Sequence, residues 1–250
     1  MVTPKEINRQ NREYYGQVEP PVPAYERRFV AYIDIVGWKD ACYDSRQHAT
    51  VFAVAKTLCE LPGNFSRDLK DKLNQTRAVA PDHSHQKTEV VTFSDNLAIS
   101  TAVDVGHTLF FKFLTSVCCQ LLTKGFLARG GVTVGDVCHK ENMIFGPALI
   151  EAVSLEKEAS FPRLMCSRNL IEEVERSPDH DLSDLQVIIP DHLGQPVVNL
   201  LAFAQQSNPA AWQDIETKIA EKIILLDSHL EKWRYMSNLL QRMIQGTSKR

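Results

Sequence analysis

Two aspartates, Asp34 and Asp95, have the surroundings in this sequence that point most directly to chemistry. Asp34 interrupts an apolar run, residues 29–38, which predicts a strand covered on both faces. An ionised carboxylate in such a position is costly unless a cation or a metal ion compensates it. Gly37 then lets the backbone turn sharply toward a ligand, and a helix is expected to start at Trp38. The stretch predicts a place where phosphates and a hard cation meet.

Asp95 lies between two β-prone runs, residues 90–93 and 97–100, in a turn-forming Ser-Asp-Asn sequence. This pattern predicts a tight hairpin. By itself, an aspartate at a hairpin tip is usually a turn residue. If the hairpin lies beside the first strand, Asp34 and Asp95 converge. Two carboxylates that repel each other in a dry site favour a divalent metal ion over a structural pair.

Composition limits the class of protein. With 250 residues, 44% of them hydrophobic, the chain can bury one sizeable core or one domain plus an appendage. A net charge of −3 gives no reason to expect nucleic acid or an anionic membrane as partner. The six cysteines lack metal-ligand spacing, the polar N-terminus carries no signal segment, and the most apolar run, residues 108–122, is too short to span a membrane. We therefore expect a cytoplasmic protein with reduced cysteines.

The chain divides into three parts by composition. Residues 1–25 are polar and then proline-rich, which predicts a flexible lead-in. Residues 26–205 carry the strand and helix patterns of one folded domain, and their order predicts an α/β sandwich with a mixed sheet. Residues 206–250 space apolar residues as in a long helix, which is expected to pack on the domain or on a partner chain. His83 and His85 could bind a metal, but without further ligands they are expected to be solvent-exposed.

Two further segments carry unusual glycines. Residues 126–135 predict a glycine-rich strand, and Phe145-Gly146-Pro147 precedes a helix expected to run to Ala159. Glycines inside a strand imply the close approach of a ligand or another backbone. Tight packing under a helix is an equal alternative.

Taken together, four motifs resemble, in the same order, the catalytic domain of class III nucleotidyl cyclases. They are the strand and turn at residues 32–38, the Phe-Ser-Asp-Asn hairpin at 93–96, the glycine-rich strand at 129–135, and Phe-Gly-Pro-Ala at 145–148 before a helix. The resemblance covers roughly residues 29–201. Within that family, the longer sequence FGPALIEA and the later Phe161-Pro162-Arg163 look like the bacterial pyrimidine cyclases of Pycsar antiphage defence.

This resemblance implies a ferredoxin-like core that forms a head-to-tail homodimer, with catalytic sites at the subunit interface. In the family, two acids hold two Mg²⁺ or Mn²⁺ ions, which acidify the ribose 3′-hydroxyl and grip the triphosphate. The 3′ oxygen then attacks the α-phosphorus, and pyrophosphate leaves. Carried over residue by residue, the resemblance gives the metal ligands Asp34, Asp95 and the carbonyl of Ile35, and the nucleotide contacts Gly37, Trp38, Lys39 and Phe93.

The sequence departs from the family where purine cyclases read the base. Val91 and Met143 stand at those positions, and neither can hydrogen-bond a purine edge, so recognition of adenine or guanine of the usual type is lost. Tyr43 is our candidate for reducing the pocket to pyrimidine size, with a plain packing tyrosine as the equal alternative. We favour UTP over CTP as substrate.

The family's transition-state asparagine and arginine are also replaced, by Ile150 and Ser154. Another cation must therefore neutralise the charge that develops on the phosphates. The candidates are Arg129, Lys157 and Arg163, and for each of them a solvated surface charge is the alternative.

These expectations define a uridylate cyclase that makes cyclic UMP as a second messenger in antiphage defence, read by a separate effector protein that the enzyme does not contact. The alternatives are a cytidylate cyclase and a degenerate domain that binds a nucleotide without chemistry. The presence of both Asp34 and Asp95 favours an enzyme. The missing asparagine and arginine count against one.

Overall fold

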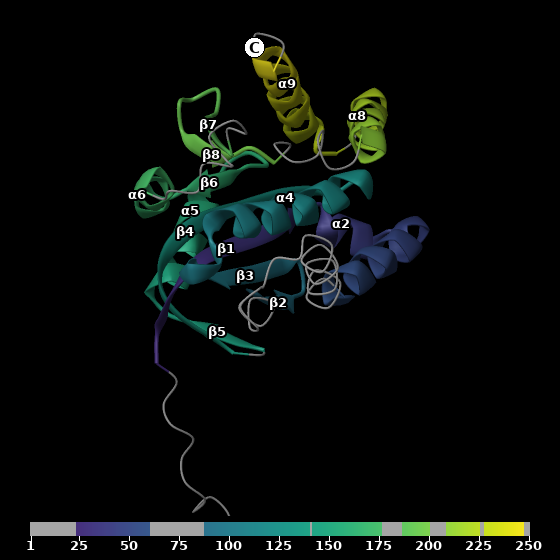
Figure 1. Cartoon of the computed structure of the whole chain (residues 1–250). Coiled ribbons are helices and arrows are strands. Elements are labelled where there is room, and N and C mark those ends of the chain that lie inside the picture. The colour runs from purple at the N-terminus through teal and green to yellow at the C-terminus, as the bar shows by residue number, and fades with distance from the viewer. Residues whose placement is uncertain are drawn as a thin grey trace, which may run out of the picture.

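The computed structural model describes residues 24–60, 88–140, 142–176, 187–200, 209–225 and 228–247. In these ranges a sheet of eight strands carries helices on both faces (Figure 1). The strands are β1 (Glu26–Val36), β2 (Thr88–Phe93), β3 (Asn96–Ala102), β4 (Leu127–Lys140), β5 (Met143–Phe145), β6 (Leu164–Cys166), β7 (Ile188–Pro190) and β8 (Pro196–Val198). The helices include α2 (Trp38–Tyr43), a helix over residues 48–60, α4 (His107–Thr123), α5 (Pro147–Glu158), α6 (Arg168–Arg176), α8 (Pro209–Ile224) and α9 (Leu230–Thr247).

The first four strands form a ferredoxin-like core. Their order in the sheet is β2-β3-β1-β4, and β1 pairs antiparallel with both β3 and β4. Helices precede the β2–β3 hairpin and β4 along the chain, which gives the split β-α-β arrangement of this fold. Because β4 pairs parallel with β6, the sheet is mixed. The predicted mixed-sheet, ferredoxin-like α/β fold is confirmed.

Side chains alternate between the two faces of β1, and this alternation decides where Asp34 lies. Phe29, Ile33 and Ile35 point into the large hydrophobic cluster that also contains residues of α4, α8 and α9. Val30 points the other way, into a small cluster with Ala148 and Ala152 of α5. Asp34 shares the face of Val30. The carboxylate therefore lies on the thinly covered side of the sheet, the α5 face, and not in the main core.

The glycines of β4 serve close packing. A Cβ atom at Gly131 would overlap the carbonyl oxygen of Ala152 in α5, and one at Gly130 would overlap the carbonyl oxygen of Tyr32 in β1. Of the two readings that the sequence allows for this glycine-rich strand, packing under a helix is the one that the structure supports.

The C-terminal residues form two helices, so the expectation of a single long helix is wrong. The apolar stripe does continue from α8 to α9, with Ile215, Ile219, Trp233 and Met236 all buried in the large cluster. The helix itself is interrupted between Ile224 and Leu230, where Ser228 belongs to a residue type that favours a turn or a helix start. Both helices pack on the domain. Within the described ranges, no helix combines the length and the apolar character needed to cross a membrane.

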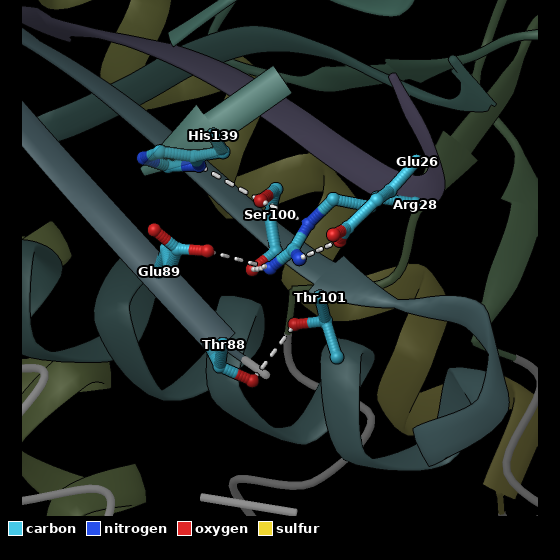
Figure 2. A network of polar contacts seen from close by, with 7 residues as sticks. All are labelled: Glu26, Arg28, Thr88, Glu89, Ser100, Thr101 and His139. Atoms are coloured by element: carbon cyan, nitrogen blue, oxygen red, sulfur yellow. Dashed lines mark hydrogen bonds and ion pairs between the residues drawn. The ribbon is translucent and has the colours of Figure 1, made fainter. Parts of the chain in front are cut away.

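A polar network is buried on the α5 face at the opposite end of β1 from Asp34 (Figure 2). Arg28 donates from Nε to Ser100 Oγ at 2.8 Å and from Nη1 to Glu26 Oε2 at 3.0 Å, and its Nη2 lies 3.4 Å from Glu89 Oε1. The Ser100 hydroxyl lies 2.7 Å from Nδ1 of His139. Burial and then the charge of Arg28 lower the pKa of His139 to about 4, so this imidazole is neutral.

Candidate functional site

The structure brings the two predicted acids to one place. Asp34 lies opposite Asn96 in the β1–β3 register, and the amide of Ile35 donates to the carbonyl of Asp95 at 2.8 Å. The hairpin turn therefore sits beside the end of β1, as the sequence predicts. Burial raises the pKa of Asp34, the charge of Arg129 opposes this, and the charge of Asp95 raises the pKa further. The two carboxylates act on each other.

Arg129 compensates Asp34 in the structure. It lies opposite Asp34 in the β1–β4 register, and its Nη2 atom is 2.8 Å from Oδ2 of Asp34 and 2.7 Å from Oε1 of Glu156. Glu156 is a buried residue of α5. One nitrogen atom of a half-buried guanidinium thus serves two carboxylates. The Arg129 side chain is therefore a neighbour of the proposed metal acids.

A short chain of hydrogen bonds orients Asp95. The hydroxyl of Tyr32 donates to Asn96 Oδ1 at 2.8 Å, and Nδ2 of Asn96 donates to Asp95 Oδ1 at 2.9 Å. Burial, followed by the charges of Glu156, Asp34 and Asp95, raises the pKa of Tyr32, so its hydroxyl remains a donor. Asp95 is therefore held from β1 and β3 together.

The backbone turns at Gly37 between β1 and α2. Gly37 has φ +89°, a conformation that favours glycine, and Trp38 behind it is buried against Phe126 with ring centroids 5.5 Å apart. Trp38 is therefore a core residue that fixes the start of α2. Lys39 beside it is exposed. The predicted contacts of this turn with phosphates stay predictions.

Other predicted site residues lie apart from this cluster. Arg163 is buried in an ion pair with Asp191, and Lys157 is exposed on α5. Tyr43 is 84% exposed at the end of α2. Phe93 is 79% exposed, but its register through Asn96 places it on the same face of the sheet as Asp34. The proposed roles of these four residues stay predictions.

The oxygen atoms available here suit a metal ion that takes some of its ligands from the protein and the others from a substrate. No cluster of three or more His, Cys, Asp or Glu side chains in the described ranges is arranged to hold an ion. Magnesium is usually held by one or two carboxylates together with substrate phosphates, and not by a cage made of protein alone. Asp34 and Asp95 match that pattern, with the carbonyl of Ile35 as a further predicted ligand. His83 and His85 lie outside the described residues.

Sequence reasoning missed Glu156. It follows Ala148 and Ala152 at intervals of four residues, and both alanines are buried. An acid on the buried stripe of an amphipathic helix needs a partner inside the protein. That spacing is the signal that could have found it.

No family model matches the sequence, and no curated protein matches it. Among solved structures, the chain is similar to a bacterial light-regulated adenylyl cyclase, with a TM-score of 0.46 and 12% identity over 86% of this chain and 66% of that one. The adenylyl cyclase CyaB from P. aeruginosa gives a TM-score of 0.35 and 13% identity over 71% of this chain and 93% of that one. An adenylate/guanylate cyclase/hydrolase from Silicibacter pomeroyi gives 0.33 and 16% over 69% and 95%. At these scores the likenesses establish neither family nor activity, so the functional assignment depends on the residues of the site.

Proposed function

We propose that this protein is a metal-dependent nucleotidyl cyclase that converts UTP to 3′,5′-cyclic UMP and pyrophosphate. The observation that carries the proposal is the meeting of Asp34 and Asp95 beside the Gly37 turn, on a thinly covered face of the sheet. Two neighbouring ionised carboxylates that are partly buried destabilise the folded protein unless a cation compensates their charge. A nucleoside triphosphate with its divalent ions supplies both the cations and the phosphates that such a site accommodates.

The chain's residues divide the work as follows. Asp34 and Asp95 would hold the divalent ions, which when bound supply Lewis acidity at the ribose hydroxyl and at the phosphates. Tyr32 and Asn96 keep the Asp95 carboxylate in place. In the reaction the 3′ oxygen forms a bond to the α-phosphorus, the bond from that phosphorus to pyrophosphate breaks, and the hydroxyl proton leaves to solvent. The Gly37 turn lets the phosphates approach the backbone closely.

The choice of a pyrimidine is supported by what lines the α5 face near the acids. The register places Val91 beside Ala98, and Ala98 beside Tyr32, all on the same face as Asp34. Val91 offers no hydrogen bond to a purine edge. Met143 in β5 lies at the other end of the sheet, where β5 pairs with residues 138–140 of β4. UTP is the preferred substrate and CTP the alternative.

A homodimer completes the proposed site. Phe93 and Ile150 are 79% and 68% exposed, and a second copy that packed on them would bury their apolar surface. A second copy would cover the α5 face and enclose the nucleotide. The role in antiphage defence, with a separate effector that reads the cyclic nucleotide, follows from the resemblance of the motifs and is part of the same proposal.

One alternative has an observation of its own in its favour. Arg129 already neutralises Asp34, as it would in a degenerate domain that binds nucleotides without metal chemistry. Incubation of the purified chain with each radiolabelled NTP and Mn²⁺ distinguishes the two functions. A cyclic product from UTP or CTP supports the cyclase. Binding of nucleotide with no cyclic product from any NTP would leave the binding module.

A further inference from the structure

A groove lies between α9 and the end of the sheet that carries β7 and β8 (Figure 1). Its volume is about 640 Å³, which is within the range of binding sites for organic ligands. One wall is a face of α9 on which Tyr235, Asn238 and Arg242 follow one another at helical spacing. The other wall is formed by Phe161, which precedes β6, and by His192 in the turn between β7 and β8. The groove is therefore built from segments that are far apart in the sequence.

Three aromatic rings form one side of this groove and hold each other in place. Phe161 stacks on Tyr235, with ring centroids 5.0 Å apart and an angle of 12° between the planes. His192 meets Phe161 edge to face at 5.5 Å and Tyr235 at 5.2 Å. Tyr235 is buried, Phe161 is half-buried and His192 is exposed, so the rings lead from the core to the solvent. The imidazole of His192 thus offers a surface on which a planar ring of a ligand can stack.

Hydrogen bonds beneath His192 keep its turn in one conformation. The carboxylate of Asp191 forms a buried ion pair with Arg163 and also accepts hydrogen bonds from the backbone amides of Leu193 and Gln195, at 2.8 and 2.9 Å. The amide of Asp191 donates in turn to the carbonyl of Gln195 at 2.9 Å. This fixed loop positions His192 before a ligand arrives, which lowers the entropic cost of binding.

The charges of the described lining residues favour an anion. Glu231 is the one carboxylate among them, and it forms an ion pair with Arg234 at 2.9 Å. Arg242, about two turns further along α9, is exposed and pairs with no carboxylate in the part of the chain that the structure describes. Asn238 and Gln241 stand between the two arginines along the helix, and each side-chain amide carries both donors and an acceptor. The groove therefore combines a stacking surface, an uncommitted cation and groups that can hydrogen-bond the edge of a heterocycle.

We propose that this groove binds a small organic anion with a planar heterocycle, of the class of the nucleoside monophosphates. The base stacks on His192, the phosphate pairs with Arg242, and the neighbouring side-chain amides hydrogen-bond the edge of the base. Tyr235 in the wall of the groove belongs to the large hydrophobic cluster, whereas Asp34 lies on the α5 face of the sheet. The groove is therefore separate from the proposed site at Asp34, and its ligand does not depend on the cyclase function.

The test measures the binding of AMP, GMP, CMP and UMP to the full chain by calorimetry, in EDTA so that no divalent ion is present. At least one of these nucleotides should bind. The corresponding nucleoside, which lacks the phosphate, and ribose 5-phosphate, which lacks the base, should each bind about tenfold more weakly.

Two variants at exposed positions of the groove locate the ligand. Arg242→Gln should weaken binding of the nucleotide about tenfold and change the affinity for the nucleoside less than about twofold, because it removes only the partner of the phosphate. His192→Ala should weaken binding of both compounds about tenfold, because it removes the stacking surface. Arg168→Gln, on the exposed surface of α6, is the matched control for the lost charge and should change each affinity less than about twofold.

Three results would overturn the proposal. The first is that no nucleoside monophosphate binds at millimolar concentration. The second is that ribose 5-phosphate binds as tightly as the nucleotide, since the groove would then attract anions without recognising a ring. The third is that Arg242→Gln and His192→Ala bind the nucleotide as Arg168→Gln does, because the nucleotide would then occupy another place, such as the proposed site at Asp34.

Discussion

Two arginines on the α5 face of the sheet, Arg28 and Arg129, each contact two carboxylates, but they differ in burial and in how many of their nitrogen atoms have partners. Arg28 is 3% exposed and bonds Ser100, Glu26 and Glu89 (Figure 2). At the other end of β1, about 20 Å along the strand, the side chain of Arg129 is 31% exposed.

The difference lies in how fully each guanidinium is satisfied. Arg28 directs Nε, Nη1 and Nη2 to separate partners. Arg129 shares its Nη2 atom between two carboxylates, and its buried Nε has no hydrogen-bond partner in the structure as described. A buried network in which every polar group is hydrogen-bonded makes the structure rigid. A cluster that has more carboxylates than cations, as at Arg129, can accept a metal ion in place of the arginine. With the proposed function, the comparison leads us to expect a role in stability at the Arg28 end and a role in chemistry at the Arg129 end.

The largest expected effect separates the two ends by activity. Asp34→Asn and Asp95→Asn should each lower the rate of UTP cyclisation by at least about 10³-fold, because each removes the charge of a proposed metal ligand. Asp136→Asn, at an exposed position of the same sheet, is the matched control and should leave the rate unchanged. Initial rates with Mn²⁺ provide the measurement. Near wild-type turnover by either site variant would show that the metal assignment is wrong.

The next effect should appear in stability and not in chemistry. Arg28→Met should lower the free energy of unfolding by about 2–3 kcal/mol, because it removes a buried donor to Ser100 and the ion pair of the partly buried Glu89. Arg27→Met is the control at the neighbouring position, where a half-exposed pair with Glu173 should contribute less than about 1 kcal/mol. Urea denaturation measures both. An Arg28→Met protein as stable as the control would contradict a structural role for this end.

A third effect depends on pH. The folded-state pKa of His139 is about 4, below the ordinary value of 6.5, so the unfolded chain takes up the proton first as the pH falls. Its contribution to stability is therefore present above pH 6.5 and is lost as the pH falls toward 4, by roughly 2–3 kcal/mol. His139→Gln should flatten the dependence of unfolding free energy on pH in that window. An unchanged slope would mean that other groups control it.

The smallest effect sharpens the account of Arg129. If its guanidinium competes with a metal ion for Asp34, Arg129→Met should tighten Mn²⁺ binding in the absence of nucleotide by about fivefold, roughly 1 kcal/mol. Arg27→Met again controls for the lost charge. Weaker Mn²⁺ binding by Arg129→Met would instead indicate that the arginine supports the metal acids.

The sequence predicts much of the core because its signals are local. The apolar run around Asp34 and the turn residues at Asp95 each determine an element, and antiparallel pairing of neighbouring elements brings the two acids together. The short strands β5 and β6 were not predicted, because three-residue strands carry too little periodicity to be distinguished from loops. The helix α6 was not predicted either. The break between α8 and α9 was hidden by an apolar stripe that continues through both helices.

The site was harder to predict where it depends on packing between distant elements. Glu156 is a single charge on the inward stripe of α5, and only the docking of that helix on β4 places it near Arg129 and Asp34. No pattern in the sequence indicates that Arg163 forms a buried ion pair with Asp191, 28 residues later. The exposure of Tyr43 likewise depends on how α2 ends against the domain. Such contacts are set by tertiary geometry, which residue patterns do not record.

The missing side chain at Gly131 has a consequence for how this site can evolve. Because the backbone of α5 rests directly on β4 there, nothing flexible separates the strand that carries Arg129 from the helix that carries Glu156. The distance between those two charges is therefore governed by an uncharged position. A single methyl group added at residue 131 would displace the helix and change the electrostatics of the acids, while every ionisable residue stays the same. Variation at uncharged positions therefore offers a route to altered affinity for the proposed metal ions.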